Sequence, residues 1–432
     1  MSESDNLFKY SRIALSLTAL MLSSTVIAQN TSLPAVSAPS AYGDSVNAGV
    51  AAASSTARAL APPAGVKGEV NGGFSLGITF GTTWHTNPER RLDEPDDGDI
   101  AFLLTPNIGY SGSVGRHSFE IGYSTNSESF QDFETEDSDW WRLNGALQLD
   151  MSEILIGDIY ASRTEGEEER GAAGSRTLSL TGEDEYREDV IGGRITLGRR
   201  SNLLQIYVGA EEGTLSYLNN GQDFRDRDRS TAEAGLFFNI GPRTSIFIRA
   251  QETEFDYLAG NPSIDSTENS LTAGVAWEPT EALSMTLQAG NLEKDFDDPS
   301  LVGYDGGTYL GKLTWQPRDR TVVSLYASKA TEESSDIDST FYVSEVIGAD
   351  LSQRLGDRTS LTLRYSVSDN EYSDGRFDDI TDYGLSLGYA ARNWLSFGLS
   401  FNSIDYNSTN VSENYEDEVI SFFVSITPTV GS

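Results

Sequence analysis

Apolar and polar residues alternate along most of this chain after residue 70, in segments of ten residues or more. The segments come in pairs, and a unit of two segments, one tight turn and one longer acidic loop repeats about every 38 residues. The tight turns read SVGR (113–116), DMSE (150–153), GRRSN (198–202), IGPRTS (240–245), EPTEA (278–282), QPRDR (316–320), LGDR (355–358) and AARN (390–393). Alternating segments of this length, too weakly apolar for membrane helices, are typical of transmembrane β-strands.

The count of turns predicts the size of the sheet. Eight tight turns separate nine longer loops, which gives about 18 strands, the first near 73–86 and the last near 417–429. A long series of hairpins must hide its edges, and closure into a barrel does so. We therefore predict an all-β fold, a single transmembrane antiparallel β-barrel of about 18 strands (16 to 18), with short periplasmic turns and longer external loops.

The period of two assigns the faces of the strands. One face is apolar in each clear case and is expected to contact lipid, as in 74–80, 141–149, 271–277, 361–367, 395–401 and 420–426. Indole rings prefer the headgroup level of a bilayer, so tryptophans at strand ends are expected to form two girdles. These are Trp277, Trp315 and Trp394 next to the tight turns, and Trp84 and Trp140, together with Tyr257, at the loop-side ends.

Charged residues on the opposite face are candidates for the pore lining. The basic candidates are Arg142, Arg194, Arg249, Lys312 and Arg364, and the acidic ones are Glu120, Glu211, Glu278 and Asp382. Such charges could set a field that selects solutes, or they could pair with one another and brace the barrel. The sequence leaves both interpretations open.

The start of the chain has the pattern of an export signal. Lys9 and Arg12 precede a short apolar stretch at 13–22, and Val26-Ile27-Ala28 fits a small-residue cleavage pattern. We predict a signal peptide at 1–28, a flexible periplasmic segment rich in Ala, Ser and Pro at 29–70, and the barrel at 71–432. The predicted location is the outer membrane of a Gram-negative bacterium.

Charge and composition exclude several function classes. A net charge of −36 argues against nucleic acid as a partner, and the absence of cysteine excludes disulfides and thiolate metal sites. The only histidines, His85 and His117, are expected at opposite ends of the barrel, so no Ser-His-Asp set can be argued and we predict neither catalytic residues nor a cofactor. The acidic loops are expected to form a solvated rim, or to join divalent cations that bridge to lipopolysaccharide. We predict no dedicated metal site.

The stretch SLGITFGTTWHTNPERRLDEPDDGDIAFLLTPNIGYSGSVGRHSFEIGYS (75–124) resembles a family of outer-membrane β-barrel porins, the beta-barrel porin 2 family, often associated with exopolysaccharide or capsule operons. The similarity rests on an aromatic strand ending in Asn87, an acidic loop, an Asp99-led strand with Thr105-Pro106, and a basic turn before an F-x-I-x-Y strand. Asn87 is followed by Pro88, where the family usually has Ile or Val. The resemblance implies a barrel that helps a polysaccharide cross the outer membrane.

The resulting hypothesis is a channel, a conduit or accessory porin for exopolysaccharide export rather than an enzyme. Its partners would be outer-membrane lipid, lipopolysaccharide, the polysaccharide and periplasmic export components, and the sequence does not fix the oligomeric state. A general diffusion porin for small solutes and a non-conducting structural or adhesive surface barrel are the alternatives. A loop folded into the barrel would favour a porin, and 166–183, the longest loop, is the candidate constriction.

Overall fold

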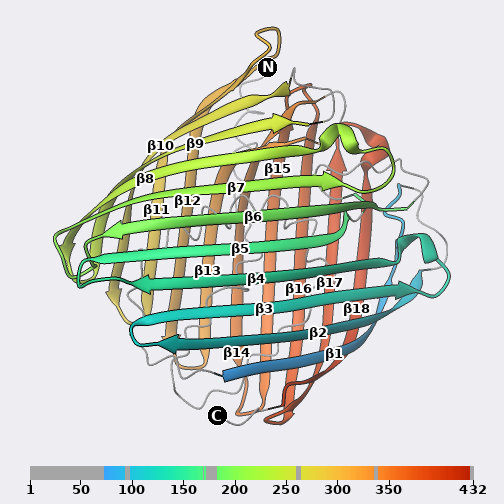
Figure 1. The fold of residues 1–432 in the computed structure, drawn as a ribbon. Coiled ribbons are helices and arrows are strands. Elements are labelled where there is room, and N and C mark those ends of the chain that lie inside the picture. The colour runs from blue at the N-terminus through green and yellow to red at the C-terminus, as the bar shows by residue number, and fades with distance from the viewer. Residues whose placement is uncertain are drawn as a thin grey trace, which may run out of the picture.

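The computed structural model describes residues 73–92, 98–168, 170–171, 182–258, 264–334 and 339–428. The predicted signal peptide and periplasmic segment lie outside these residues. Eighteen strands follow one another along the chain (Figure 1). They are β1(Gly73–His85), β2(Asp99–Val114), β3(His117–Phe130), β4(Ser138–Asp150), β5(Leu155–Glu168), β6(Asp184–Leu197), β7(Leu204–Tyr217), β8(Arg227–Gly241), β9(Thr244–Tyr257), β10(Ser266–Thr280), β11(Leu283–Phe296), β12(Tyr304–Arg318), β13(Thr321–Glu333), β14(Phe341–Arg354), β15(Thr359–Tyr372), β16(Phe377–Arg392), β17(Leu395–Ser408) and β18(Tyr415–Ile426).

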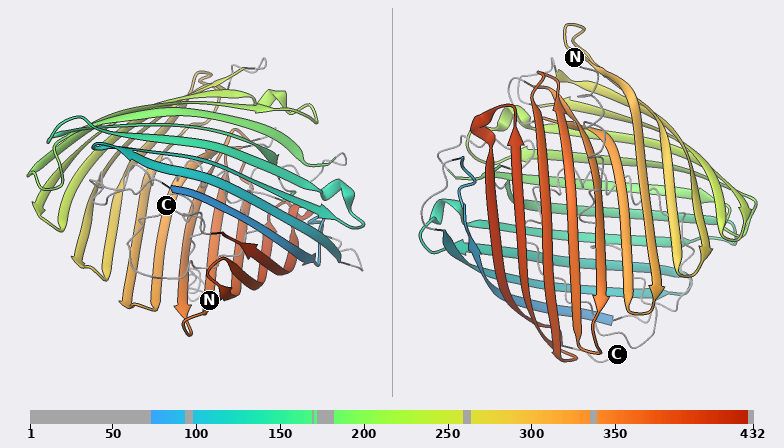
Figure 2. Two further views of the ribbon diagram at one scale, coloured as in Figure 1. Left: turned by 60° about the horizontal axis from the view of Figure 1, so that its bottom comes forward. Right: turned by 180° about the vertical axis from the view of Figure 1, so that it is seen from behind.

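The sheet is a closed ring of antiparallel strands. Each strand pairs with its neighbours in sequence, as in β8 with β9, and β1 pairs with β18 from Ile78↔Ile426 to His85↔Val419. Strands β1–β9 form one wall and β10–β18 the other, and the strand directions of the two walls cross (Figures 1 and 2). This crossing is expected because strands tilt when a sheet closes into a barrel. The predicted fold class and strand number are confirmed.

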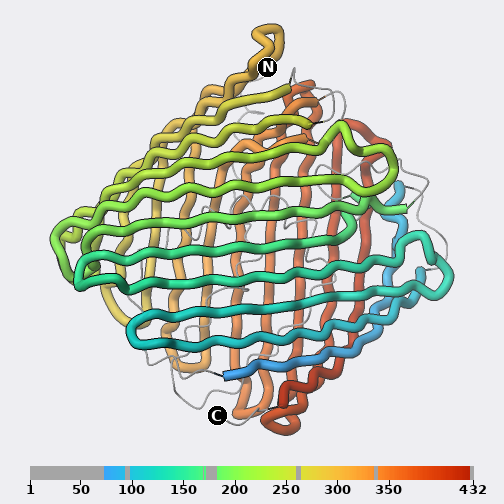
Figure 3. The backbone as a smooth tube through the Cα atoms, in the orientation of Figure 1, coloured from blue at the N-terminus to red at the C-terminus, as the bar shows by residue number. Residues whose placement is uncertain are grey.

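The connections differ between the two ends of the barrel, and the backbone trace shows the chain passing up and down between them (Figure 3). We call these the turn end and the loop end. At the turn end, hairpins close within a few residues: Gly115 adopts a φ of +63° in the turn from β2 to β3. At the loop end, short 3-10 helices such as η1(Glu134–Glu136) and η2(Asp223–Arg225) lie in the connections. None of the described residues belongs to a helix long and apolar enough to cross a membrane.

Alternation sorts the side chains of each strand into an outward and an inward set. On β9, Ile246 and Ile248 are exposed, whereas Phe247 and Arg249 are buried. The same pattern holds on β18, where Ile420 and Phe422 point outward and Phe423 packs inside against Gly398 of β17. A soluble sheet does not leave such a series of large apolar side chains in water, so lipid is the natural solvent for the outer surface.

Candidate pore lining and external mouth

The inner wall of β5–β9 carries a network of ion pairs. Glu233 on β8 forms ion pairs with two arginines, Arg194 on β6 at 2.8 Å and Arg249 on β9 at 3.0 Å. The Arg194 guanidinium also lies 4.7 Å from the centre of the Tyr207 ring. These side chains come from strands that are not all neighbours, so they meet because they share the inner face. Two predicted lining arginines are therefore held by one carboxylate that the sequence analysis did not select.

A second ion pair extends this network toward the loop end. Glu211 on β7 accepts a hydrogen bond from the Tyr160 hydroxyl at 2.6 Å and pairs with Arg229 at 2.8 Å. Glu211 was predicted to line the pore, whereas Tyr160 and Arg229 were not. The register places both partners inward, Tyr160 on β5 opposite Ala146 and Arg229 on β8 opposite Gly213. No residue of β5 or β8 was assigned to a face from the sequence, so these partners could not be selected.

Another charged cluster lies on the facing wall. Arg364 on β15 lies 3.6 Å from Asp350 on β14, and Lys312 on β12 lies within electrostatic reach of the same carboxylate. Asp382 on β16 accepts a hydrogen bond from Ser366 and interacts with Arg364. Strands β6 and β15 are nine positions apart in a ring of 18, so Arg194 and Arg364 belong to opposite walls. The two walls thus present mixed, mutually compensated charges to each other.

The remaining lining candidates have different surroundings. Glu120 on β3 and Arg142 on β4 share the inward alternation and are exposed, so both side chains meet water inside the barrel. Glu278 lies at the turn end beside a register shift in β10, and its carboxylate pairs with Arg200 of the turn after β6 at 2.9 Å. The structure therefore places Glu278 at the rim of the barrel rather than along its wall.

Three of the five girdle tryptophans lie on the outward face at strand ends: Trp84, Trp277 and Trp315 are exposed and share the alternation of the outward residues of their strands. Trp394 is exposed in the turn between β16 and β17. The prediction for Trp140 is wrong: Trp140 pairs with the buried Asn126 and shares its inward face, and the adjacent Trp141 stacks on the outward Tyr123 instead. These two assignments follow from the pleat, because neighbouring residues on a strand point to opposite faces.

Tyr257 is also corrected, because it belongs to a set of tyrosines buried inside the loop end. The set comprises Tyr217, Tyr257, Tyr342, Tyr372, Tyr406 and Tyr415. Each lies at or near the loop-side end of its strand, and Tyr257 shares the inward alternation of Arg249. Three of their hydroxyls, those of Tyr217, Tyr257 and Tyr406, donate to carboxylates, as in the Tyr406 bond to Asp378 at 2.5 Å. A strand-end position alone does not distinguish an outer girdle from an inner rim.

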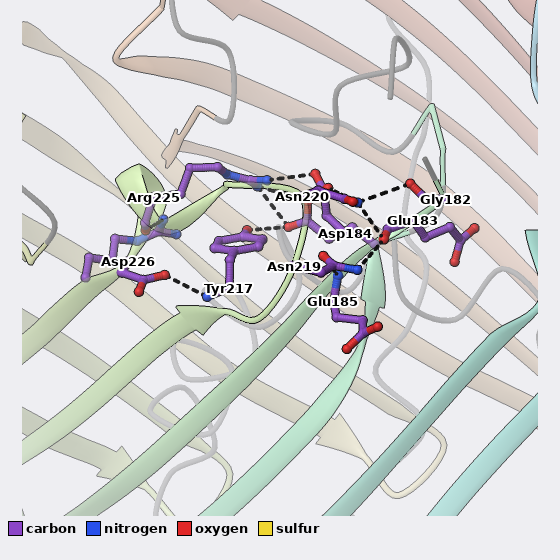
Figure 4. A network of polar contacts seen from close by, with 11 residues as sticks. Gly182, Glu183, Asp184, Glu185, Tyr217, Asn219, Asn220, Arg225 and Asp226 are labelled. Carbon is purple, nitrogen blue, oxygen red and sulfur yellow. Dashed lines mark hydrogen bonds and ion pairs between the residues drawn. The ribbon is translucent and has the colours of Figure 1, made fainter. Parts of the chain in front are cut away.

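Figure 4 shows how one of these tyrosines, Tyr217, joins the loop-end network around η2. The Tyr217 hydroxyl donates to Glu168 at 2.5 Å, and Arg225 pairs with the same carboxylate at 2.9 Å. The Arg225 guanidinium lies 3.9 Å from the centre of the Tyr217 ring. Asn220, which has a φ of +54°, donates to Asp184 at 2.9 Å and so ties the loop after β7 to the start of β6. At the loop end of this wall, hydrogen bonds and ion pairs therefore connect the ends of β5, β6 and β7 to η2.

The predicted constriction loop is tied into the mouth where it is described. Its residues 169 and 172–181 lie outside the described residues, but Arg170 and Gly171 are buried or tightly packed. Arg170 pairs with Glu136 at 2.7 Å, and the Gly171 carbonyl accepts from the Tyr415 hydroxyl at 2.9 Å. Tyr415 points inward from β18, across strands β1–β4 from the end of β5. The chain after β5 therefore reaches inside the loop end of the barrel.

His85 connects the closing strands at the same end. Its Nδ1 lies 3.2 Å from Asp417 on β18 and its Nε2 lies 3.3 Å from Glu128 on β3, and all three side chains are buried. Only an imidazolium can donate to both carboxylates at once. His117 begins β3 at the turn end, so the two histidines lie at opposite ends of the barrel as predicted. Among the described residues, no group of three or more His, Asp or Glu could hold a metal ion.

Most of the chain is similar to known protein families and structures. A family model described as "Putative beta-barrel porin 2" matches residues 62–427. A BenF-like porin from Pseudomonas fluorescens Pf-5 and OpdK from Pseudomonas aeruginosa with vanillate are each 10% identical, with 82% of this chain and 99% of theirs covered and a TM-score of 0.45. The siderophore receptor PirA from Pseudomonas aeruginosa is 11% identical over 83% of this chain and 81% of its own, with a TM-score of 0.41. No curated protein matches the chain.

Proposed function

The chain belongs to the beta-barrel porin 2 family of Gram-negative outer-membrane β-barrels, and we propose that it is a channel that serves as a conduit or accessory porin for exopolysaccharide export. The membership supports a channel rather than an enzyme. The polysaccharide is our proposal, and the chemistry of the inner wall supports it. Delivery of the barrel itself to the outer membrane would use the cleavable signal peptide predicted at 1–28.

The observation that carries the proposal is the small, hydroxylated inner wall of β15–β17. Inward positions there hold Thr362, Ser366, Ser368, Asn370, Ser400 and Asn402. Hydroxyl and amide groups exchange hydrogen bonds readily with sugar hydroxyls, and the paired charges nearby leave little net field. A conduit needs many weak contacts, because tight binding would stop transit. Such a wall suits a long polyhydroxylated polymer better than a small ion.

The proposal is tested in a producing strain from which the gene has been deleted. Complementation with the wild-type gene should restore surface polysaccharide, while Thr362→Val with Ser366→Ala and Ser368→Ala should restore it only in part, because the wall loses three hydroxyls without gaining bulk. The control is Ser230→Ala, which removes a hydroxyl from the outward face of β8. Full surface polysaccharide in the deletion strain would overturn the export function. Diffusion of small solutes through the purified protein would then favour the general porin.

A further inference from the structure

At the loop end, the hairpin of β13 and β14 leaves β12 on one edge, whereas its other edge stays paired with β15 through Tyr342↔Tyr372 and Val343↔Glu371. Pairing of β12 with β13 runs from Trp315↔Val323 only to Tyr309↔Lys329, although β12 begins at Tyr304. Pairing of β13 with β14 nevertheless continues to Glu333↔Phe341. The last residues of this hairpin are therefore bonded to each other and not to β12. We call residues 331–333 and 341–343 the hairpin tip.

One face of the tip lies against the inner surface of β9–β11, bypassing β12. Glu333 accepts from the Tyr257 hydroxyl of β9 at 2.6 Å and forms an ion pair with Lys294 of β11. Thr331 donates to Glu268 of β10, and the Phe341 ring stacks on Phe296 at 6.0 Å. Strands four positions apart in the ring meet in this way only if the tip turns into the barrel.

The other face of the tip points across the opening. The Tyr342 ring lies 4.9 Å from the ring of Tyr372, its partner on β15, and Tyr342 interacts electrostatically with Glu168 at the end of β5. Strands β5 and β14 are nine positions apart in the ring of 18 and so belong to opposite walls. Phe341, Tyr342 and Val343 are consecutive and all buried, whereas a strand in a barrel wall would leave alternate side chains outside. The tip is thus covered on both faces and, while still paired with β15, places Tyr342 within electrostatic reach of Glu168 on the opposite wall.

Apart from its pairing with β15, the tip is held most strongly through one carboxylate, because Glu333 contacts both Lys294 and Tyr257. Lys294 has no exposed surface, and its ammonium lies 4.2 Å from the centre of the Phe255 ring besides contacting Glu333. Removing one member of a buried ion pair leaves the other charge buried and uncompensated, which strongly destabilises the contact. We propose that the hairpin tip is a gate across the external mouth, held closed by Lys294 and Tyr257 through Glu333. The gate rests on the proposed function, since it matters only if the barrel conducts.

The test is single-channel recording of the refolded protein in a planar bilayer. Lys294→Gln and Tyr257→Phe each remove one bond to Glu333 and should raise the open probability, by tenfold or more for Lys294→Gln. The matched control is Lys329→Gln. Lys329 lies on β13, the strand that carries Glu333, and pairs with Glu345 at 3.4 Å, but it lies outside the tip and is half-exposed. Heat-modifiable electrophoretic mobility shows that each variant is folded.

A cross-link provides the converse measurement. The chain has no cysteine, so Glu268→Cys with Thr331→Cys can be joined by a short bismaleimide without side reactions at native thiols. Joining these positions should abolish openings. Equal open probability in Lys294→Gln, Lys329→Gln and the cross-linked protein, with normal current steps, would overturn the gate and leave the channel intact. Absence of current in every folded variant would overturn the channel itself, and the gate with it.

Discussion

At the residue scale, two glycines share one backbone conformation and differ in their surroundings. Gly171 and Gly221 have φ values of +70° and +68°. A Cβ would lie 2.4 Å from the Tyr415 ring at Gly171 and would meet nothing within 4 Å at Gly221. Alanine in this conformation costs roughly 1–2 kcal/mol at either position, and overlap adds about 1–3 kcal/mol at Gly171 alone. Urea unfolding in lipid vesicles should show the larger loss for Gly171→Ala. Equal losses would contradict the contact with Tyr415.

Glu136 gives the loop end a pH dependence that can be assigned to one group. Burial raises the pKa of the Glu136 carboxyl above its ordinary value of 4.5, and Arg170 offsets part of the rise. The folded protein keeps this proton to higher pH than the unfolded chain, so the stability contributed by the group is present below the unfolded pKa and is lost as pH rises through the raised one. Glu136→Gln cannot ionise and should lose less stability over that window. Parallel unfolding profiles of the two proteins against pH would disprove the assignment.

At the element scale, one face of each strand contacts lipid and the other faces the lumen. Two residues of equal size and exposure test how deep in the bilayer the lipid face of β9 lies. Ile248 in β9 and Leu258 just beyond it are both 53% exposed. Arginine on the lipid face costs about 2–4 kcal/mol near the middle of a bilayer and about 0–1 kcal/mol near its edge. Ile248→Arg should therefore destabilise the barrel in vesicles by several times the loss for Leu258→Arg. A similar loss for both would mean that β9 does not cross the bilayer as assigned.

The inner face of the same strands predicts ion selectivity. Glu233 compensates Arg194 and Arg249, so Glu233→Gln leaves two uncompensated cations on one wall. Because water and salt screen the interaction, the loss of this one negative charge should raise the ratio of anion to cation permeability by roughly a factor of two. Reversal potentials in a salt gradient measure this ratio. Glu281→Gln, which removes the exposed partner of Arg243 at a tight turn, should leave it unchanged.

How far the sequence predicts these elements depends on whether a feature is local. Strand number, turns and most faces follow from a period of two and from turn residues, which act within a few positions. The errors at Trp140 and Tyr257 arose from reading their strand-end position without their parity, although Arg142 and Arg249 on the same strands had already fixed the inward face. The pairing of Arg194 with Glu233 joins β6 to β8, and no local pattern contains that contact.

At the scale of the whole molecule, the sequence predicts the barrel but does not predict that a hairpin turns into its mouth. Alternation fades at the loop-side ends of β13 and β14, where the outward positions turn polar at Lys329, Thr331 and Glu333 and where Phe341 to Val343 are all apolar. A loss of alternation at a strand end does not by itself show that the hairpin leaves β12. The departure is decided by contacts with Lys294, Tyr257 and Phe296, which lie more than 30 residues away in the chain. Loop length can be read from the sequence, and it identifies 166–183 as the candidate constriction. The sequence does not show that this loop contacts Tyr415.

The most direct test of the account is the single-channel conductance of the refolded mature protein in a planar bilayer, with reversal potentials taken in a salt gradient. We predict discrete current steps, rare in the wild-type protein and frequent in Lys294→Gln, with an ion selectivity that shifts when the charge of Arg249 or Arg364 is reversed. Folded, inserted protein that gives no step in either form would contradict the assignment of this barrel as a channel.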